Sequence, residues 1–257
     1  MDFDLAKVEL LQKALTCSAE ELLSIIPQAS TEILHAALKN PLITESHLLA
    51  ALRRRDLAEE SIKRIYRLSQ TETSHTLKLA VAAHQNSPAA ILLGILPHLH
   101  LFELLNLCLL QSITPDHKLA AERTIMQRLP LTPLGNRITL ARRATPLILE
   151  ALLKEGDPRL VEICLANPKL KEGVVFQFLR SSAATAETIS MIARNQRWQG
   201  RANIREAILT NPKTPLIWFT LWLPAMKLPE VRRLLASTRL TFAQKKAVED
   251  RLAGRHS

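Results

Sequence analysis

Residues 209–215, Leu-Thr-Asn-Pro-Lys-Thr-Pro, combine a helix stop signal with a helix start signal. Asn211 can adopt the left-handed conformation that closes many helices, and Pro212 prevents the helix from continuing. Thr214 can accept a hydrogen bond from a free backbone N–H at the start of the next helix, and Pro215 has no N–H to leave unpaired there. This stretch predicts two helices joined by a very short turn.

Both signals recur along the chain. The stop signal returns at 38–41 and 165–168, and the start signal returns at Ser87-Pro88, Thr114-Pro115, Thr132-Pro133, Thr145-Pro146 and Asp157-Pro158, with a capping box at Ser18 and Glu21. With the apolar spacing, they predict about 18 helices of roughly 8 to 14 residues. Glycine is rare, aromatic residues make up 4% of the chain, and no segment alternates as a strand, so we expect an all-α protein.

Helices this short are marginal alone, so a chain of them predicts stacked layers, an α-solenoid. The signals also repeat at an offset of about 127 residues. The offset places Asn40-Pro41 on Asn167-Pro168, Leu52-Arg53 on Leu179-Arg180, Pro88 on Pro215 and Leu96-Pro97 on Leu223-Pro224. We therefore expect two similar halves, residues 1–129 and 130–257, in one continuous superhelix.

The motif formed by Leu209, Asn211, Pro212, Thr214 and Pro215 resembles the repeats of bacterial leucine-rich repeat variant proteins. The chain departs from their regular repeat of about two dozen residues, since its clearest period is about 127. The resemblance implies an armadillo/HEAT-like right-handed stack of helices. It also implies a protein that acts as a binding scaffold through a concave face.

The sequence favours binding over catalysis. It has no Gly-rich phosphate loop, no Gly-x-Ser-x-Gly elbow and no His-Glu-x-x-His helix, so we expect neither an enzyme nor a cofactor. His98 and His100 form the closest histidine pair, but they would diverge on a helix, and we predict no metal site. Cys17, Cys108 and Cys164 lie far apart among apolar residues, which predicts buried thiols and no disulfide.

Residues 89–110 are apolar and long enough to raise the question of a membrane span. Pro97 and several polar residues interrupt them, which favours a pair of buried helices. The opening residues 1–4, Met-Asp-Phe-Asp, lack the basic start of a secretory signal. We expect a cytoplasmic protein with no integral membrane span.

The net charge of +10 comes from the second half of the chain. Residues 1–129 have 13 basic and 14 acidic side chains, whereas residues 130–257 have 21 basic and 10 acidic ones. The densest cluster, in a stretch expected to join two helices, consists of Arg194, Arg197, Trp198, Arg201 and Arg205, with Arg232-Arg233 and Lys245-Lys246 as extensions. Arginine with tryptophan can dock acidic protein surface, or contact phosphates and stack on bases.

Two interpretations of this cluster stay open. It is a partner-binding site, or it is a solvated loop in which Trp198 packs onto helix ends. Trp218, Phe219 and Trp222 have helical spacing and are expected in the core, with a binding hot spot as the alternative. We predict a non-catalytic scaffold for a protein partner; the alternative is a solenoid that binds nucleic acid or another polyanion through its basic half.

Overall fold

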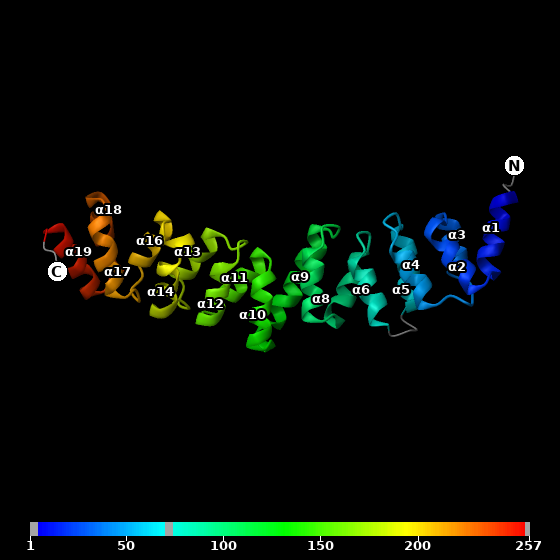
Figure 1. Ribbon diagram of the computed structural model, residues 1–257, viewed down its shortest axis with the longest axis horizontal. Helices are drawn as coiled ribbons and strands as arrows, with labels where there is room; N and C mark the ends of the chain where they lie inside the picture. Colours follow the sequence, from blue (N-terminus) through cyan, green and yellow to red (C-terminus); the bar gives the residue numbers. More distant parts are fainter. Residues whose placement is uncertain (1–4, 70–73, 255–257) are drawn as a thin grey trace. The chain divides into compact units, whose positions relative to one another are not determined.

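The computed structural model describes residues 5–69 and 74–254, and these residues form helices and turns with no strand (Figure 1). The prediction of an all-α protein is confirmed: 18 α-helices have seven residues or more, and α15 has four. Residues 1–4, on which the expectation about a secretory signal rests, lie outside the described part. The chain divides into two compact units, Met1–Gln127 and Arg128–Ser257.

In the first unit, short 3-10 elements (η1, η2) extend two of the α-helices. The elements are α1 (Leu5–Thr16), α2 (Ala19–Ile25), η1 (Ile26–Gln28), α3 (Thr31–Ala37), α4 (Glu45–Leu52), α5 (Glu59–Ser69), α6 (His75–Ala83), α7 (Ala89–Ile95), η2 (Leu96–His98), α8 (Leu101–Leu109) and α9 (Pro115–Arg128), whose last residue begins the second unit.

The second unit has the same character. Its elements are η3 (Leu129–Leu131), α10 (Leu134–Arg143), α11 (Pro146–Lys154), α12 (Pro158–Ala166), α13 (Glu172–Arg180), α14 (Ala186–Arg194), α15 (Gln196–Gln199), α16 (Ala202–Leu209), α17 (Leu216–Trp222), η4 (Leu223–Ala225), α18 (Leu228–Leu235) and α19 (Phe242–Leu252).

Within each unit, helices pack on neighbours two or three helices away along the chain. In the second unit, α12 packs between α10 and α14, while α13 packs between α11 and α16. In the first unit, α3 packs between α1 and α5, while α6 packs between α4 and α8. Each helix therefore buries one stripe, such as Ile189, Ile192 and Ala193 on α14, which are all fully buried.

Helices begin at the predicted positions. At several of these starts, however, the residue before the proline does not cap the helix with its side-chain hydroxyl. Asp157 caps α12 as expected, since its carboxylate accepts from the Arg159 N–H at 2.9 Å. Thr145 precedes α11, yet its hydroxyl is buried with no hydrogen-bond partner among the described residues. The Thr214 hydroxyl donates to the Ile208 carbonyl at the end of the preceding helix. The cap interaction predicted for Thr214 is therefore wrong, although a helix does begin beside it.

The stop signals mark helix ends, but their asparagines act differently from the prediction. No described non-glycine residue has a positive φ, and Asn167 is extended with φ of −73°. Each asparagine is buried, and its side-chain amide donates to a carbonyl of an earlier helix or loop and accepts from the N–H two residues later. These donor bonds run from Asn40 to Ala14 and Cys17, from Asn167 to Ala141 and Arg142, and from Asn211 to Leu179.

The apolar segment 89–110 forms two helices, α7 and α8, as predicted. Among the described helices, none combines the length and the apolar character that crossing a membrane requires. The three cysteines are buried and unpaired, which confirms their predicted role as small apolar side chains. Burial raises the pKa of the Cys108 and Cys164 thiols to about 12.

Candidate functional site

The predicted arginine cluster lies around α15, a single turn of helix between α14 and α16. Asn195 begins this turn, because its side-chain oxygen accepts from the Arg197 N–H at 3.0 Å. The sequence predicted a connection between two helices here. The extra turn fixes where the side chains of Arg197 and Trp198 lie.

Arg197 binds the backbone of the preceding stop signal. Its Nη1 donates to the Asn167 carbonyl at 2.7 Å, and its Nη2 donates to the carbonyls of Pro168 at 3.0 Å and Leu170 at 2.9 Å. The planar fork of a guanidinium suits several acceptors in one plane. In this structure Arg197 therefore holds the turn between α12 and α13.

Trp198 lies beneath the arginines. Its side chain is 1% exposed, and its Nε1 is 3.4 Å from the Leu165 carbonyl. The guanidinium carbons of Arg197 and Arg201 lie 4.5 Å and 5.5 Å from the centre of the indole ring. The indole therefore offers no free face on which a base could stack, and Trp198 packs onto helix ends as the second interpretation held.

Two of the remaining arginines also have protein partners. Arg201 forms an ion pair with Glu172 at 2.6 Å. Arg205 donates to the Gln199 carbonyl at 3.2 Å and lies 5.6 Å from the centre of the Trp222 ring. Arg194 is exposed and forms no ion pair with any residue that the structure describes. The structure brings Arg197, Trp198 and Arg201 together, but as a packed unit and not as a row of free cations.

A second group of arginines lines a hollow of about 360 Å³ over α13, α16 and α18. Arg180, Arg233 and Arg239 are exposed there, and none of them forms an ion pair with a described residue. Phe176, Asn203 and Glu206 share the lining, with the Arg180 guanidinium 5.5 Å from the centre of the Phe176 ring. From this area only Arg232-Arg233 was predictable, as an extension of the patch, because the other lining residues are distributed over α13, α16 and the turn after α18.

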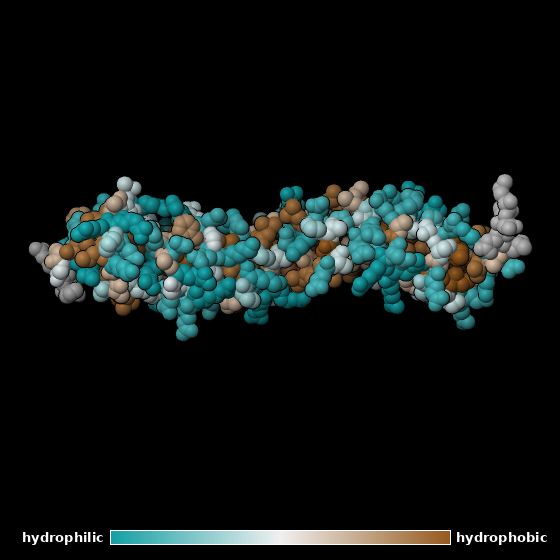
Figure 2. Space-filling view, turned by 90° about the horizontal axis from the view of Figure 1, so that it is seen from above, coloured by the Kyte–Doolittle hydropathy of each residue, from teal (hydrophilic) through white to brown (hydrophobic). Residues whose placement is uncertain are grey.

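The aromatic group on α17 belongs to the core. Trp218 is 7% exposed and Phe219 is fully buried, while Trp222 is half-buried against the apolar cluster of the C-terminal helices. The Trp218 Nε1 donates to the Ser190 hydroxyl at 3.0 Å. The prediction of core positions is confirmed for Trp218 and Phe219. Apolar side chains do remain on the surface, in separate patches among hydrophilic residues (Figure 2).

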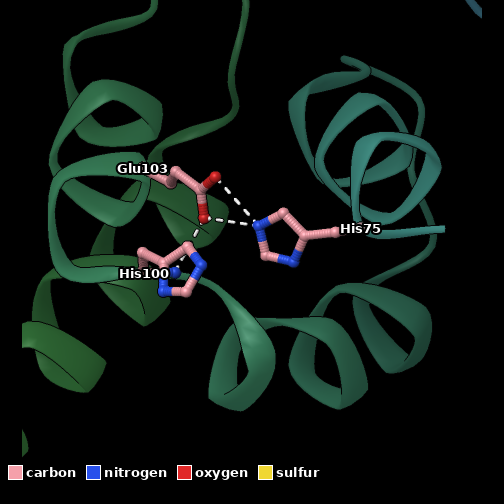
Figure 3. A group of neighbouring side chains, drawn as sticks. All are labelled: His75, His100 and Glu103. Atoms are coloured by element: carbon pink, nitrogen blue, oxygen red, sulfur yellow. Dashed lines mark hydrogen bonds and ion pairs between the residues drawn. The ribbon is translucent and has the colours of Figure 1, made fainter. Parts of the chain in front are cut away.

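The first unit contains a cluster that the sequence did not predict, formed by His75, His100 and Glu103 (Figure 3). His75 is the first residue of α6, His100 directly precedes α8, and Glu103 lies in its first turn. His75 Nε2 is 2.9 Å from each Glu103 carboxylate oxygen. The only signal in the sequence was the His100–Glu103 spacing, because packing of α6 on α8 supplies His75.

Glu103 is also bound to its own helix. The His100 backbone N–H donates to the carboxylate at 2.7 Å. Burial raises the pKa of Glu103, but the hydrogen bonds from the His100 backbone and the His75 ring lower it by more, and its net pKa lies below the ordinary value. The carboxylate is therefore ionised at neutral pH.

No known protein family, curated protein or solved structure matches this chain in the comparisons made with each of them.

Proposed function

We propose that each unit is an α-solenoid and that the two units arose by duplication. The helix starts support this proposal: α4, α7 and α8 begin at Glu45, Ala89 and Leu101, and α13, α17 and α18 begin 127 residues later at Glu172, Leu216 and Leu228. The same offset relates two buried bonds, from Asn40 to the Ala14 carbonyl and from Asn167 to the Ala141 carbonyl. The resemblance to armadillo/HEAT-like repeats agrees with it.

We further propose that the protein is a binding scaffold for a protein partner, with the hollow over α13, α16 and α18 as its binding surface. The observation that carries this proposal is the mixed lining of the hollow. Arg180, Arg233 and Arg239 offer cations, Glu206 offers a carboxylate, and Phe176 offers an apolar ring. A protein segment with acidic and apolar side chains complements such a lining, because arginine and aromatic residues are typical anchors of protein interfaces.

Nucleic acid is the second candidate. The positive excess of the second unit and the three unpaired arginines favour it, since each arginine could neutralise a phosphate. Glu206 in the hollow and the buried Trp198 count against it, because a carboxylate repels phosphate and a buried ring cannot stack on a base. The two candidates differ in salt dependence, which a binding measurement can resolve.

The test replaces Arg180, Arg233 and Arg239 with Glu in one variant. The control variant replaces Arg142, Arg232 and Lys246 with Glu; these residues are exposed, lie outside the hollow and change the net charge by the same amount. Partners are captured from a cell extract with and without nuclease, and the affinity of each captured partner is then measured against salt. A protein captured in the presence of nuclease, and lost only by the first variant, supports the proposal.

Two other results contradict the proposal. Capture that disappears with nuclease, with affinity falling steeply as salt rises, favours nucleic acid. Equal loss of binding in the two variants shows that the net charge matters and the hollow does not. Exposed arginines contribute little to stability, so both variants should fold as the parent does, which circular dichroism checks.

A further inference from the structure

We propose that His75, His100 and Glu103 bind one Zn²⁺ ion, or a similar borderline divalent transition metal. Among the residues that the structure describes, this is the one group of three potential ligand side chains whose ligand atoms all lie within 4.8 Å of one another. Two imidazole nitrogens and one carboxylate are a donor set that zinc accepts, with a water molecule in the fourth position. Calcium and magnesium prefer oxygen ligands alone, so the two imidazoles select against them.

The spacing of the ligand atoms is close to what such a site requires. Zinc bonds of about 2.0 to 2.1 Å place neighbouring tetrahedral ligands about 3.4 Å apart. His75 Nε2 and the Glu103 oxygens are 2.9 Å apart, so a metal ion would replace their hydrogen bond after a small separation. The His75 and His100 ring centres are 4.8 Å apart. The His100 side chain belongs to the capping box of α8 and is exposed, so a rotation of its ring, which would loosen that cap, can close the remaining distance.

The ligands are already oriented by the fold. The His100 N–H holds the Glu103 carboxylate toward His75, and the two rings lie next to each other beside that carboxylate (Figure 3). Hydrogen bonds that fix a ligand in this way raise metal affinity. Other histidines differ: both ring nitrogens of His47 and of His84 have partners from the protein itself. Those imidazoles hold backbone turns and are not available to a metal ion.

The Glu103 carboxylate is the ligand on which the site depends most. The N-terminal ends of α6 and α8 meet at the cluster, and the partial positive charge of helix N-termini opposes a bound cation. The two imidazoles are uncharged when they act as ligands, so the carboxylate supplies the only negative charge. We therefore expect Glu103→Gln to weaken zinc binding more than the loss of either histidine.

The experiment uses the full chain without a histidine tag, after treatment with a chelator. Zn²⁺ binding is measured by isothermal titration, and coordination is checked by the visible absorption of bound Co²⁺. The variants are His75→Gln, His100→Ala and Glu103→Gln, and the control is His98→Ala, an exposed histidine two residues from His100 that lies outside the cluster. His75→Gln keeps a donor for Glu103, so it separates loss of metal binding from loss of the hydrogen bond.

We expect one Zn²⁺ per chain for the parent and for His98→Ala, with a higher melting temperature when the metal is present, since a ligand stabilises the state that binds it. Each cluster variant should bind at least about 10- to 100-fold more weakly, as loss of a supporting partner alone already does. The proposal is wrong if the parent binds no zinc, if His75→Gln binds as tightly as the parent, or if His98→Ala loses binding equally. Circular dichroism without metal shows whether each variant is folded.

Discussion

Two turns of the second unit, residues 167–170 and 211–214, have the same sequence pattern but are held by different side chains. Each turn begins with Asn-Pro-Lys. In each turn, the backbone carbonyls of the first, second and fourth residues accept hydrogen bonds from one side chain about 30 positions later in the sequence. Arg197 binds the first turn, whereas the neutral Gln244 binds the second at 3.2, 3.2 and 2.9 Å.

The difference shows what the turn requires. An Asn-Pro turn directs three carbonyls to one point, and buried or partly buried carbonyls need donors. A guanidinium and an amide both meet that need, so positive charge is not essential. Arg197, the residue at the centre of the predicted binding cluster, occupies a position that an uncharged residue fills elsewhere in the same unit. The residue that follows the donor also differs. Trp198 follows Arg197 and lies beneath it as an aromatic support, whereas Lys245, which is not aromatic, follows Gln244.

The largest effect on stability is expected from removing the Trp198 ring beneath Arg197. Trp198→Ala should lower the free energy of unfolding by about 3 to 5 kcal/mol, since the fully buried ring leaves a large cavity. Urea denaturation followed by circular dichroism measures the change. Phe242→Ala is the control, because this ring is 85% exposed and its loss should change stability by less than about 0.5 kcal/mol. Equal effects of the two substitutions would show that Trp198 is not packed as described.

The next largest effect is expected at the asparagine that begins each turn, and it shows whether the two asparagines contribute equally to stability. Asn167→Ala and Asn211→Ala should each lower the free energy of unfolding by about 1 to 3 kcal/mol, because each leaves a buried carbonyl and a turn N–H without a partner. Chemical denaturation of both variants checks this. A clear loss for one asparagine and none for the other would mean that the two turns are stabilised differently.

The smallest effect is expected from exchanging the donor of the first turn. Arg197→Gln should change the free energy of unfolding by less than about 1.5 kcal/mol, because the amide still presents donors to the carbonyls. The reverse exchange, Gln244→Arg, should be more harmful, because Gln244 is buried and its Oε1 accepts from the Thr241 N–H, which a guanidinium cannot do. Arg197→Ala serves as the control and should be more destabilising than Arg197→Gln, as measured by thermal unfolding. If Arg197→Gln is as harmful as Arg197→Ala, the charge or the contact with Trp198 is what holds the first turn.

Helix boundaries were predictable from the sequence because they depend on local chemistry. Proline cannot continue a helix, so Pro158 and Pro168 mark a start and an end wherever the chain places them. The chemistry of the cap was less predictable. The Thr214 hydroxyl bonds to a carbonyl at the end of the preceding helix and not to a local N–H. Asn211 accepts from the local Lys213 N–H and also donates to the Leu179 carbonyl of an earlier helix, which packing supplies.

The candidate sites depended still more on packing. The arginine cluster is dense in sequence, yet Arg197 and Arg201 bind Asn167 and Glu172 from the preceding helical layer. The hollow and the histidine cluster are dispersed in sequence and form only because helices that are not consecutive pack together, such as α13 on α16 and α6 on α8.

The sequence by itself determined that this protein is all-helical, where the helices bounded by proline begin or end, and that its positive charge lies in the second half. Only the tertiary structure decided which polar side chains face the surface and which bind backbone of an earlier layer. The physical reason is that helix propensity and capping act over a few residues. The partner of a side chain such as Arg197 or His75 depends on a helix about 30 positions away, whose placement is set by the burial of apolar stripes.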